Sequence, residues 1–246
     1  GAYSFGVALA IDVSDLRILG PRAYRREQAR VSITDTIGGH VIAAAADRVE
    51  IGWVKFVPLT AARIFLPASG CDNLTMHDFV FDQRTVAASV ATGLLLGTGT
   101  FKGHTFRDFT SYSDQAGGPV LAYTVAHNLL IKDYILWHGH LTTGATMAVA
   151  LLFISGASLG IAIEEGRGNL SGLASNAVTN LVSAFESGGD VSNLTVRKFN
   201  GSIGFCAATA LVTLASSAEA AEVGIQTAYL DAVSAGAGGV GTPYTA

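Results

Sequence analysis

Three aspartates recur at matching places along the chain, and of all the polar residues they are the best candidates for acid–base catalysis. Asp78, Asp108 and Asp133 each follow a cation or potential cation and precede an aromatic ring. If their segments stack as parallel strands, neighbouring carboxylates lie about 5 Å apart, and those two strands apart lie about 10 Å apart. Separations in this range occur between the paired carboxylates of retaining and inverting glycosidases. Stacked like charges also raise at least one carboxyl pKa, which a general acid needs.

The same aspartates also have a structural interpretation. Each carboxylate would accept backbone N–H bonds at the end of a strand and would recur because the turn recurs. The preceding residues, His77, Arg107 and Lys132, would offset the repulsion between the carboxylates, and the aromatic rings would pack as a column. Lys198 occupies the matching place in a later copy, so we expect the ladder of carboxylates not to extend there.

Other side chains are candidates for binding rather than catalysis. His77, Arg107 and Lys132 form a row beside the aspartates, and Trp137 and His138 follow a few residues after the third. His138 begins an H-x-H pair, but two imidazoles without a third ligand favour an exposed loop over a metal site. The sequence shows no P-loop, dinucleotide fingerprint or G-x-S-x-G elbow in a usable context. We therefore expect no metal and no cofactor.

The elements that must position these residues are short strands that recur along the chain. An apolar residue, a gap of one and a second apolar residue occur in eight copies, the fourth with a histidine: Leu16/Ile18, Val49/Ile51, Leu74/Met76, His104/Phe106, Leu129/Ile131, Leu159/Ile161, Leu194/Val196 and Val223/Ile225. The copies start about 25–35 residues apart and alternate with period two, as half-buried strands do. His104 either faces inward and bonds a carbonyl, or marks a local slip of register at Gly103.

A second apolar run precedes most copies, about 7–10 residues earlier, with Gly, Ser, Asn or Asp in between. Asp15, Asn73, Asn128 and Asn193 stand just before their copies, which indicates a ladder of turns with side chains bonded between rungs. One unit is therefore a strand, a tight turn, a strand and a looser return. Stacked units predict an all-β fold: a single-stranded parallel β-helix, or solenoid, of about eight to nine rungs.

The repeat assigns residues 1–234 to one β-helix domain and residues 235–246 to a Gly-rich C-terminal tail. The composition agrees, with 29 Gly, 50% hydrophobic residues and only 14% charged residues. Two segments depart from the pattern. Residues 21–30 are expected to form an exposed, arginine-rich excursion, and residues 176–185 form either a further strand, which we favour, or a short helix.

Charge and cysteine content exclude several classes of protein. A net charge of −4 without a basic stripe argues against a nucleic-acid surface. Cys71 and Cys206 would lie several rungs apart, too far for a disulfide, and are expected to be small buried residues. Residues 141–163 carry no charge and are long enough to cross a bilayer. Interruptions by Gly and Ser favour two strands of a rung instead, so we expect no membrane span.

Three strings carry a family resemblance: Val13-Ser-Asp-Leu-Arg-Ile-Leu-Gly20, Cys71-Asp-Asn-Leu-Thr-Met-His-Asp-Phe79 and Val191-Ser-Asn-Leu-Thr-Val-Arg-Lys-Phe199. In these strings the chain resembles the right-handed parallel β-helix superfamily over about residues 8–230. Within that superfamily it is most similar to a bacteriophage tailspike or tail fibre. Pectate-lyase-like enzymes belong to the same superfamily. The chain lacks their calcium-type Asp clusters, their Arg-centred motif and the loop insertions that wall a polysaccharide cleft, so no catalytic residue carries over. The resemblance implies a homotrimeric shaft.

Fold alone does not select an activity, so three hypotheses stand. The first is a structural or receptor-binding virion appendage that recognises a bacterial surface glycan and contacts other virion proteins. The second is a polysaccharide-degrading glycoside hydrolase or lyase with its acid and base among Asp78, Asp108 and Asp133. The third is a secreted, extracellular adhesin. The sequence favours the non-enzymatic appendage, and hence a location in the virion.

Overall fold

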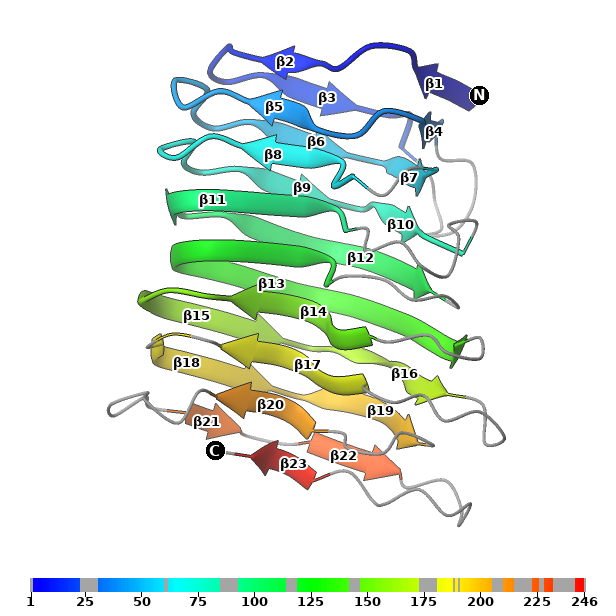
Figure 1. The fold of residues 1–246 in the computed structure, drawn as a ribbon, viewed down its shortest axis with the longest axis vertical. Coiled ribbons are helices and arrows are strands. Elements are labelled where there is room, and N and C mark those ends of the chain that lie inside the picture. The colour runs from blue at the N-terminus through cyan, green and yellow to red at the C-terminus, as the bar shows by residue number, and fades with distance from the viewer. Residues whose placement is uncertain are drawn as a thin grey trace.

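The protein is a single coil of parallel strands in the computed structural model (Figure 1). The structure describes residues 2–22, 31–59, 62–84, 93–113, 119–141, 147–172, 181–187, 189, 191–204, 210–214, 223–225, 228–231 and 242–245. In these residues the regular elements are all strands, and every pairing between them is parallel. The predicted parallel β-helix is confirmed.

Each coil contributes to three parallel sheets. The first sheet contains β2 (Ala10–Ile11), β5 (His40–Ile42), β8 (Phe65–Pro67), β11 (Leu95–Lys102), the start of β13 (Leu121–Leu141), β14 (Met147–Ile154), β17 (Leu181–Ser187), β20 (Ala210–Leu214) and β23 (Thr242–Thr245). The second contains β3 (Arg17–Leu19), β6 (Glu50–Gly52), β9 (Thr75–His77), the start of β12 (Thr105–Ser113), the middle of β13, β15 (Ser158–Glu164), β18 (Val191–Arg197) and β21 (Val223–Ile225). The third contains β1 (Ala2–Phe5), β4 (Val31–Asp35), β7 (Val54–Pro58), β10 (Val80–Asp82), the ends of β12 and β13, β16 (Arg167–Gly172), β19 (Phe199–Gly204) and β22 (Ala228–Asp231).

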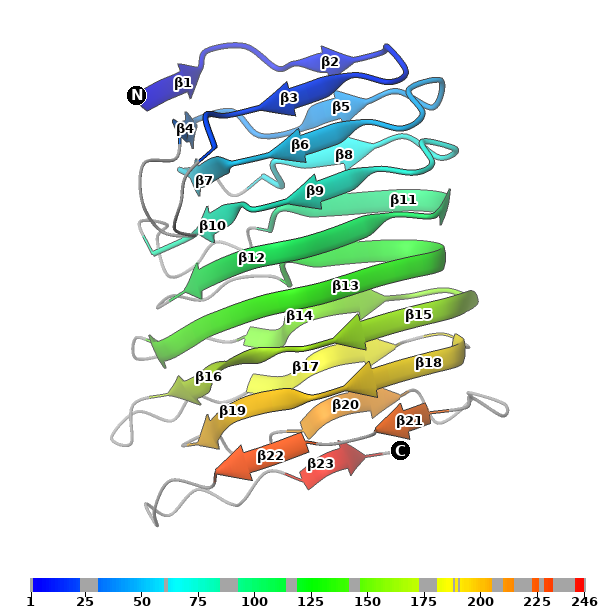
Figure 2. The same ribbon diagram turned by 180° about the vertical axis from the view of Figure 1, so that it is seen from behind.

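The coil is right-handed. In Figure 1 the first sheet faces the viewer and its strands run leftward as the chain descends from the N-terminus, while Figure 2 shows the second sheet on the opposite side. The first sheet is nine strands deep, in agreement with the eight to nine rungs expected. The sequence pattern predicted only two strands per coil, and the third sheet, which lies just after the aspartates in the three coils that carry them, was missed.

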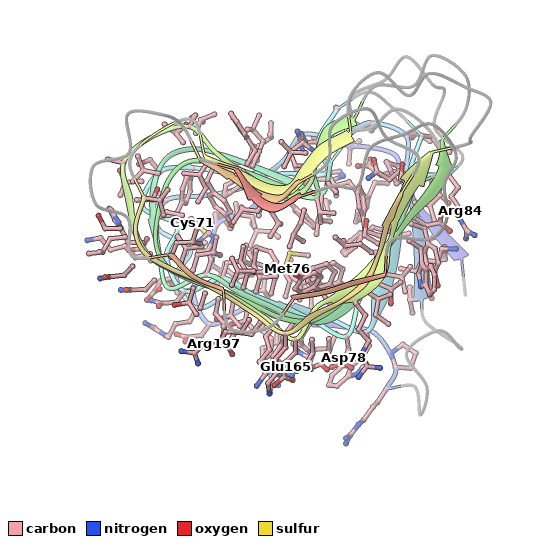
Figure 3. The ribbon with its side chains drawn as sticks, turned by 90° about the horizontal axis from the view of Figure 1, so that it is seen from below. Cys71, Met76, Asp78, Arg84, Glu165 and Arg197 are labelled. Carbon is pink, nitrogen blue, oxygen red and sulfur yellow. The ribbon has the colours of Figure 1, made fainter. Side chains whose placement is uncertain are left out.

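The apolar pairs face inward and form continuous columns. Ile18, Ile51, Met76 and Phe106 follow one another in register across the second sheet, and the last three are fully buried. Figure 3 looks along the coil and shows Cys71 and Met76 pointing into the packed interior. Cys71 is a free, buried thiol, as predicted, whereas Cys206 lies outside the described residues.

One copy of the repeat was assigned the wrong register. Leu129 is paired with Ile161 and Ile131 with Ile163, so the sixth inward pair is Ile161/Ile163 rather than Leu159/Ile161. Leu159 is 46% exposed. The error arose because three residues spaced by two offer two equally apolar pairs, and only the neighbouring coils select between them.

Two columns of left-handed residues turn the chain between sheets. The first, between the first and second sheets, is the predicted turn ladder and comprises Asp15, Arg48, Asn73, Gly103, Asn128, Gly160 and Asn193, all with positive φ. Asn73 Nδ2 donates to Asp47 Oδ1 of the preceding coil at 2.9 Å, which confirms bonding between rungs. Asn and Gly suit these positions because they tolerate the left-handed region.

Other sequence expectations fall partly outside the described residues. Of the segment 141–163, the described part forms the end of β13, β14 and most of β15, which confirms the two-strand interpretation. No helix able to cross a bilayer occurs in the part of the chain that the structure describes. Strand β17 occupies the end of segment 176–185. Most of the excursion at 21–30 is not described, and β23, paired with β20, lies inside the segment expected to be a tail.

Candidate functional site

The three aspartates do lie together, at the turn between the second and third sheets. Arg107 is paired with His77 on one side and with Lys132 on the other, so the aspartates that follow these residues stand on successive coils. Parallel strands place them about 4.8 Å apart along the coil axis. The row of candidate cations, His77, Arg107 and Lys132, is likewise brought into one column.

The ladder of carboxylates is one residue longer than predicted. Lys132 is paired with Glu164, and Glu164 with Arg197, so Glu165 follows Asp133 and precedes Lys198. We call the left-handed residues at this turn the corner column: Trp53, Asp78, Asp108, Asp133, Glu165 and Lys198. The same misassigned register hid Glu165, because counting four residues from Ile161 instead of Leu159 would have found it.

The aromatic rings after the aspartates pack inside the coil. Phe79 and Phe109 are stacked with centroids 4.7 Å apart and planes 4° apart, and Tyr134 continues the stack at 6.0 Å. All three rings are buried. The carboxylates therefore project from a turn whose next residue is fixed by core packing, which agrees with the structural interpretation of the ladder.

His77 is the most constrained member of the row of cations. Its Nδ1 lies 2.9 Å from Asp78 Oδ2 and its Nε2 lies 2.8 Å from Glu50 Oε1, and the residue is only 2% exposed. The ring is therefore held between two carboxylates, one on its own coil and one on the preceding coil. Arg17 also bonds Glu50 and holds its pKa below the usual range, which completes a polar network over three coils.

Asp108 and Asp133 have different partners. Arg107 Nη1 donates to Asp108 Oδ2 at 2.9 Å, a charge-assisted bond between consecutive residues. Burial and a hydrogen bond to Glu165 raise the pKa of Asp133. The same hydrogen bond, aided by Lys132 and Lys198, lowers the pKa of Glu165. The pKa values of these two carboxyl groups are therefore pushed apart, with that of Asp133 the higher, which is the direction that acid–base chemistry uses.

Trp137 and His138 are not part of this cluster. They belong to the end of β13 in the third sheet, where Trp137 is paired with Tyr112 and its indole is 47% exposed. The expectation of an exposed loop at residues 138–140 was wrong, because these residues continue β13 and pair with β16, while their side chains lie outside the described residues. Among the residues the structure does describe, no group of three or more His, Cys, Asp or Glu side chains could hold a metal ion.

His104 faces inward, the first of its two predicted alternatives. Its Nε2 lies 2.7 Å from the Cys71 carbonyl oxygen and its Nδ1 lies 2.8 Å from the Tyr123 hydroxyl oxygen. A carbonyl can only accept, so Nε2 carries the hydrogen and Nδ1 accepts from the tyrosine. Burial lowers the pKa of His104 and raises that of Tyr123, so both are neutral. This network is sealed in the core and supports the fold.

Comparison with known proteins adds little. No family model matches the sequence, and no curated protein matches it. A solved structure that is similar is the mannuronan C-5 epimerase AlgE6 A-module of Azotobacter vinelandii, with 10% sequence identity, coverage of 80% of this chain and 67% of that chain, and a TM-score of 0.28. A likeness this weak carries no argument about activity, so the functional argument rests on the chain's own residues.

Proposed function

We propose that the chain forms the shaft of a virion appendage, a bacteriophage tailspike or tail-fibre subunit, that recognises a bacterial surface glycan. The observation that supports this most is the corner column together with its row of cations. From Trp53 to Lys198 the column crosses six coils, about 24 Å along the axis at 4.8 Å per coil. A straight, regularly spaced row of hydrogen-bonding groups suits a linear, repeating ligand such as a polysaccharide.

The side chains of this row are held in place before any ligand arrives. His77 is fixed between two carboxylates, and Arg107 is bonded to Asp108. Binding groups on rigid strands lose little conformational entropy when they engage a ligand. Sugar hydroxyl groups can donate to the carboxylates and accept from the guanidinium and ammonium groups. Outward positions on a shared core also allow the ligand preference to change without changing the fold.

A glycan array of bacterial polysaccharides tests the proposal. The wild-type protein should bind, and replacing both Arg107 and Lys132 by Ala should weaken that binding at least tenfold. The matched control is Lys102→Ala, because Lys102 is also exposed but precedes the other turn of the coil. A wild-type protein that binds no polysaccharide contradicts glycan recognition.

The appendage role includes assembly into a homotrimer and a place in the virion beside other virion proteins. Light scattering should give three times the chain mass for the purified protein. A monodisperse monomer would count against the tailspike or fibre assignment, although not against glycan binding. A secreted adhesin is the remaining non-enzymatic candidate and requires an export signal in the full reading frame.

A polysaccharide-degrading enzyme is favoured by one observation, the stacked carboxylates of Asp133 and Glu165, whose pKa values are shifted in opposite directions. In this alternative Asp133 is the general acid, and another carboxylate of the ladder is the base or nucleophile. Asp108→Asn and Asp133→Asn should then abolish depolymerisation while the far-UV circular dichroism stays unchanged. A wild-type protein that degrades no polysaccharide it binds rules the enzyme out, whereas full activity of both variants rules out the carboxylate ladder as its active site.

A further inference from the structure

An exposed aromatic surface lies on the third sheet, around the corner from the carboxylate ladder. Trp137 projects outward with 47% exposure, and its partner on the preceding coil is the half-buried Tyr112. The guanidinium of Arg84 stands over the Tyr112 ring, 4.5 Å from its centroid. Figure 3 shows Arg84 outside the coil on the side of the third sheet, away from Asp78 and Glu165.

The charges around this surface favour an anion. Asp82 precedes Tyr112 in the same outward column, and its buried carboxylate is bonded by both Lys55 and Arg84, which leaves an excess of positive charge. Arg167 is paired with Ile135, two residues before Trp137, and is therefore diagonal to the indole. Arg167 is exposed and forms no ion pair with any residue that the structure describes.

We propose that Trp137 and Arg167 form a subsite for an acidic sugar, with the sugar ring stacked on the indole and its anionic group bound by the guanidinium. The proposal rests on the proposed glycan recognition and names the class of glycan. The negative face of an indole attracts the C–H-rich face of a pyranose ring. An unpaired guanidinium forms two parallel bonds to a carboxylate or sulfate, which an ammonium group cannot do.

A protein partner fits this surface less well. Stable protein interfaces bury about 800 Å² per partner around a cluster of apolar side chains. On the outward face of the third sheet near Trp137, the described neighbours are instead polar or half-buried: Tyr112, Arg84 and Arg167. One exposed aromatic ring beside one cation that has no ion pair among the described residues matches a single sugar ring with one anionic substituent.

Tryptophan fluorescence provides a direct test, because the chain has only two tryptophans. In a Trp53→Phe background, Trp137 is the only fluorescent indole. Titration with hexasaccharides carrying uronate, sulfate or sialic acid groups should shift its emission for at least one of them. The carboxyl-reduced or desulfated form of that hexasaccharide, which keeps the sugar backbone but loses the charge, should bind at least tenfold more weakly.

Variants separate the contribution of the Trp137 indole from that of the Arg167 guanidinium. Trp137→Ala, measured by calorimetry, should weaken the acidic hexasaccharide at least tenfold, and Arg167→Gln should make the charged and neutral forms bind alike. Leu159→Ala, which removes another exposed apolar side chain, should have no effect. If glycans bind but Trp137→Ala or Arg167→Gln changes nothing, the subsite is wrong and glycan recognition stands. If the wild type binds no acidic hexasaccharide but binds neutral glycans, the subsite is again wrong. If no glycan binds at all, both proposals fail.

Discussion

Replacing His104 by leucine should expose how much the buried polar network contributes to stability. Leucine occupies the same column position in both neighbouring coils, at Leu74 and Leu129, so the new side chain fits the column. The substitution leaves the Tyr123 hydroxyl and the Cys71 carbonyl without their bonds to His104. Each unsatisfied buried group costs about 1–3 kcal/mol, so we expect a loss of about 2–6 kcal/mol.

A double-mutant cycle isolates the network from the packing. Tyr123→Phe alone leaves the His104 Nδ1 without its hydrogen-bond donor and should lower the free energy of unfolding by about 1–3 kcal/mol. In the double variant only the Cys71 carbonyl is left without its bond to His104, so the combined loss should be smaller than the two single losses added together. Urea unfolding followed by circular dichroism and fluorescence gives the energies, provided that the two transitions coincide.

The pH dependence gives an independent check. Burial lowers the pKa of His104 in the folded protein, whereas the unfolded chain binds its proton near pH 6.5. The stability that neutral His104 contributes is therefore complete above about pH 6.5 and falls by up to about 1.4 kcal/mol per unit as the pH drops toward the lowered pKa. The destabilisation caused by His104→Leu should shrink between pH 7 and pH 5. Additive single losses, or a loss independent of pH, would refute this account of the network.

Three further predictions concern residues outside the apolar columns. Gly52→Ala should destabilise the protein by about 1–3 kcal/mol in urea unfolding, because the new Cβ would lie 2.6 Å from the His77 ring. In a His77→Ala background the same substitution should cost much less. Burial raises the pKa of Asp82, but hydrogen bonds from Arg84 and Lys55 outweigh it and lower the pKa to about 2. The free energy of unfolding of the wild type should therefore fall by about 2 kcal/mol between pH 4 and pH 2, and that of Asp82→Asn should not. Asp133→Asn should raise the melting temperature at pH 7 slightly, since like charges on adjacent strands cost about 0.2–1 kcal/mol, and an unchanged or lower value would contradict the placement of Asp133 against Glu165.

The architecture could be predicted from the sequence because its signal is repeated. Apolar pairs such as Leu74/Met76, with an Asn or Asp just before them, recur in most coils, and each copy corrects errors in the others. The third sheet was missed because several of its strands contain buried polar residues, such as Thr110 and Ser111 in β12, and do not alternate strictly. Local sequence carries little information about such strands, which depend on the coils above and below.

The candidate site was predicted in part. The alignment of Asp78, Asp108 and Asp133 followed from the repeat, whereas Glu165 required the true register of one coil. Pairings across coils, such as His77 with Glu50, depend on side-chain directions that spacing alone does not give. The contacts of Trp137 belong to a sheet that the sequence did not reveal, so its separation from the ladder could not be foreseen.

The register of the stack makes the molecule a ruler. Each coil joins its neighbours strand to strand and brings its own residue to the corner column, as Asp108 does between Asp78 and Asp133. An in-frame duplication of one coil should therefore lengthen the protein by about 4.8 Å and add one position to the column without disturbing the rest. The length of the protein and the number of residues in its corner column would therefore change together, by one coil at a time. Duplication of existing coils is thus sufficient to lengthen such a protein.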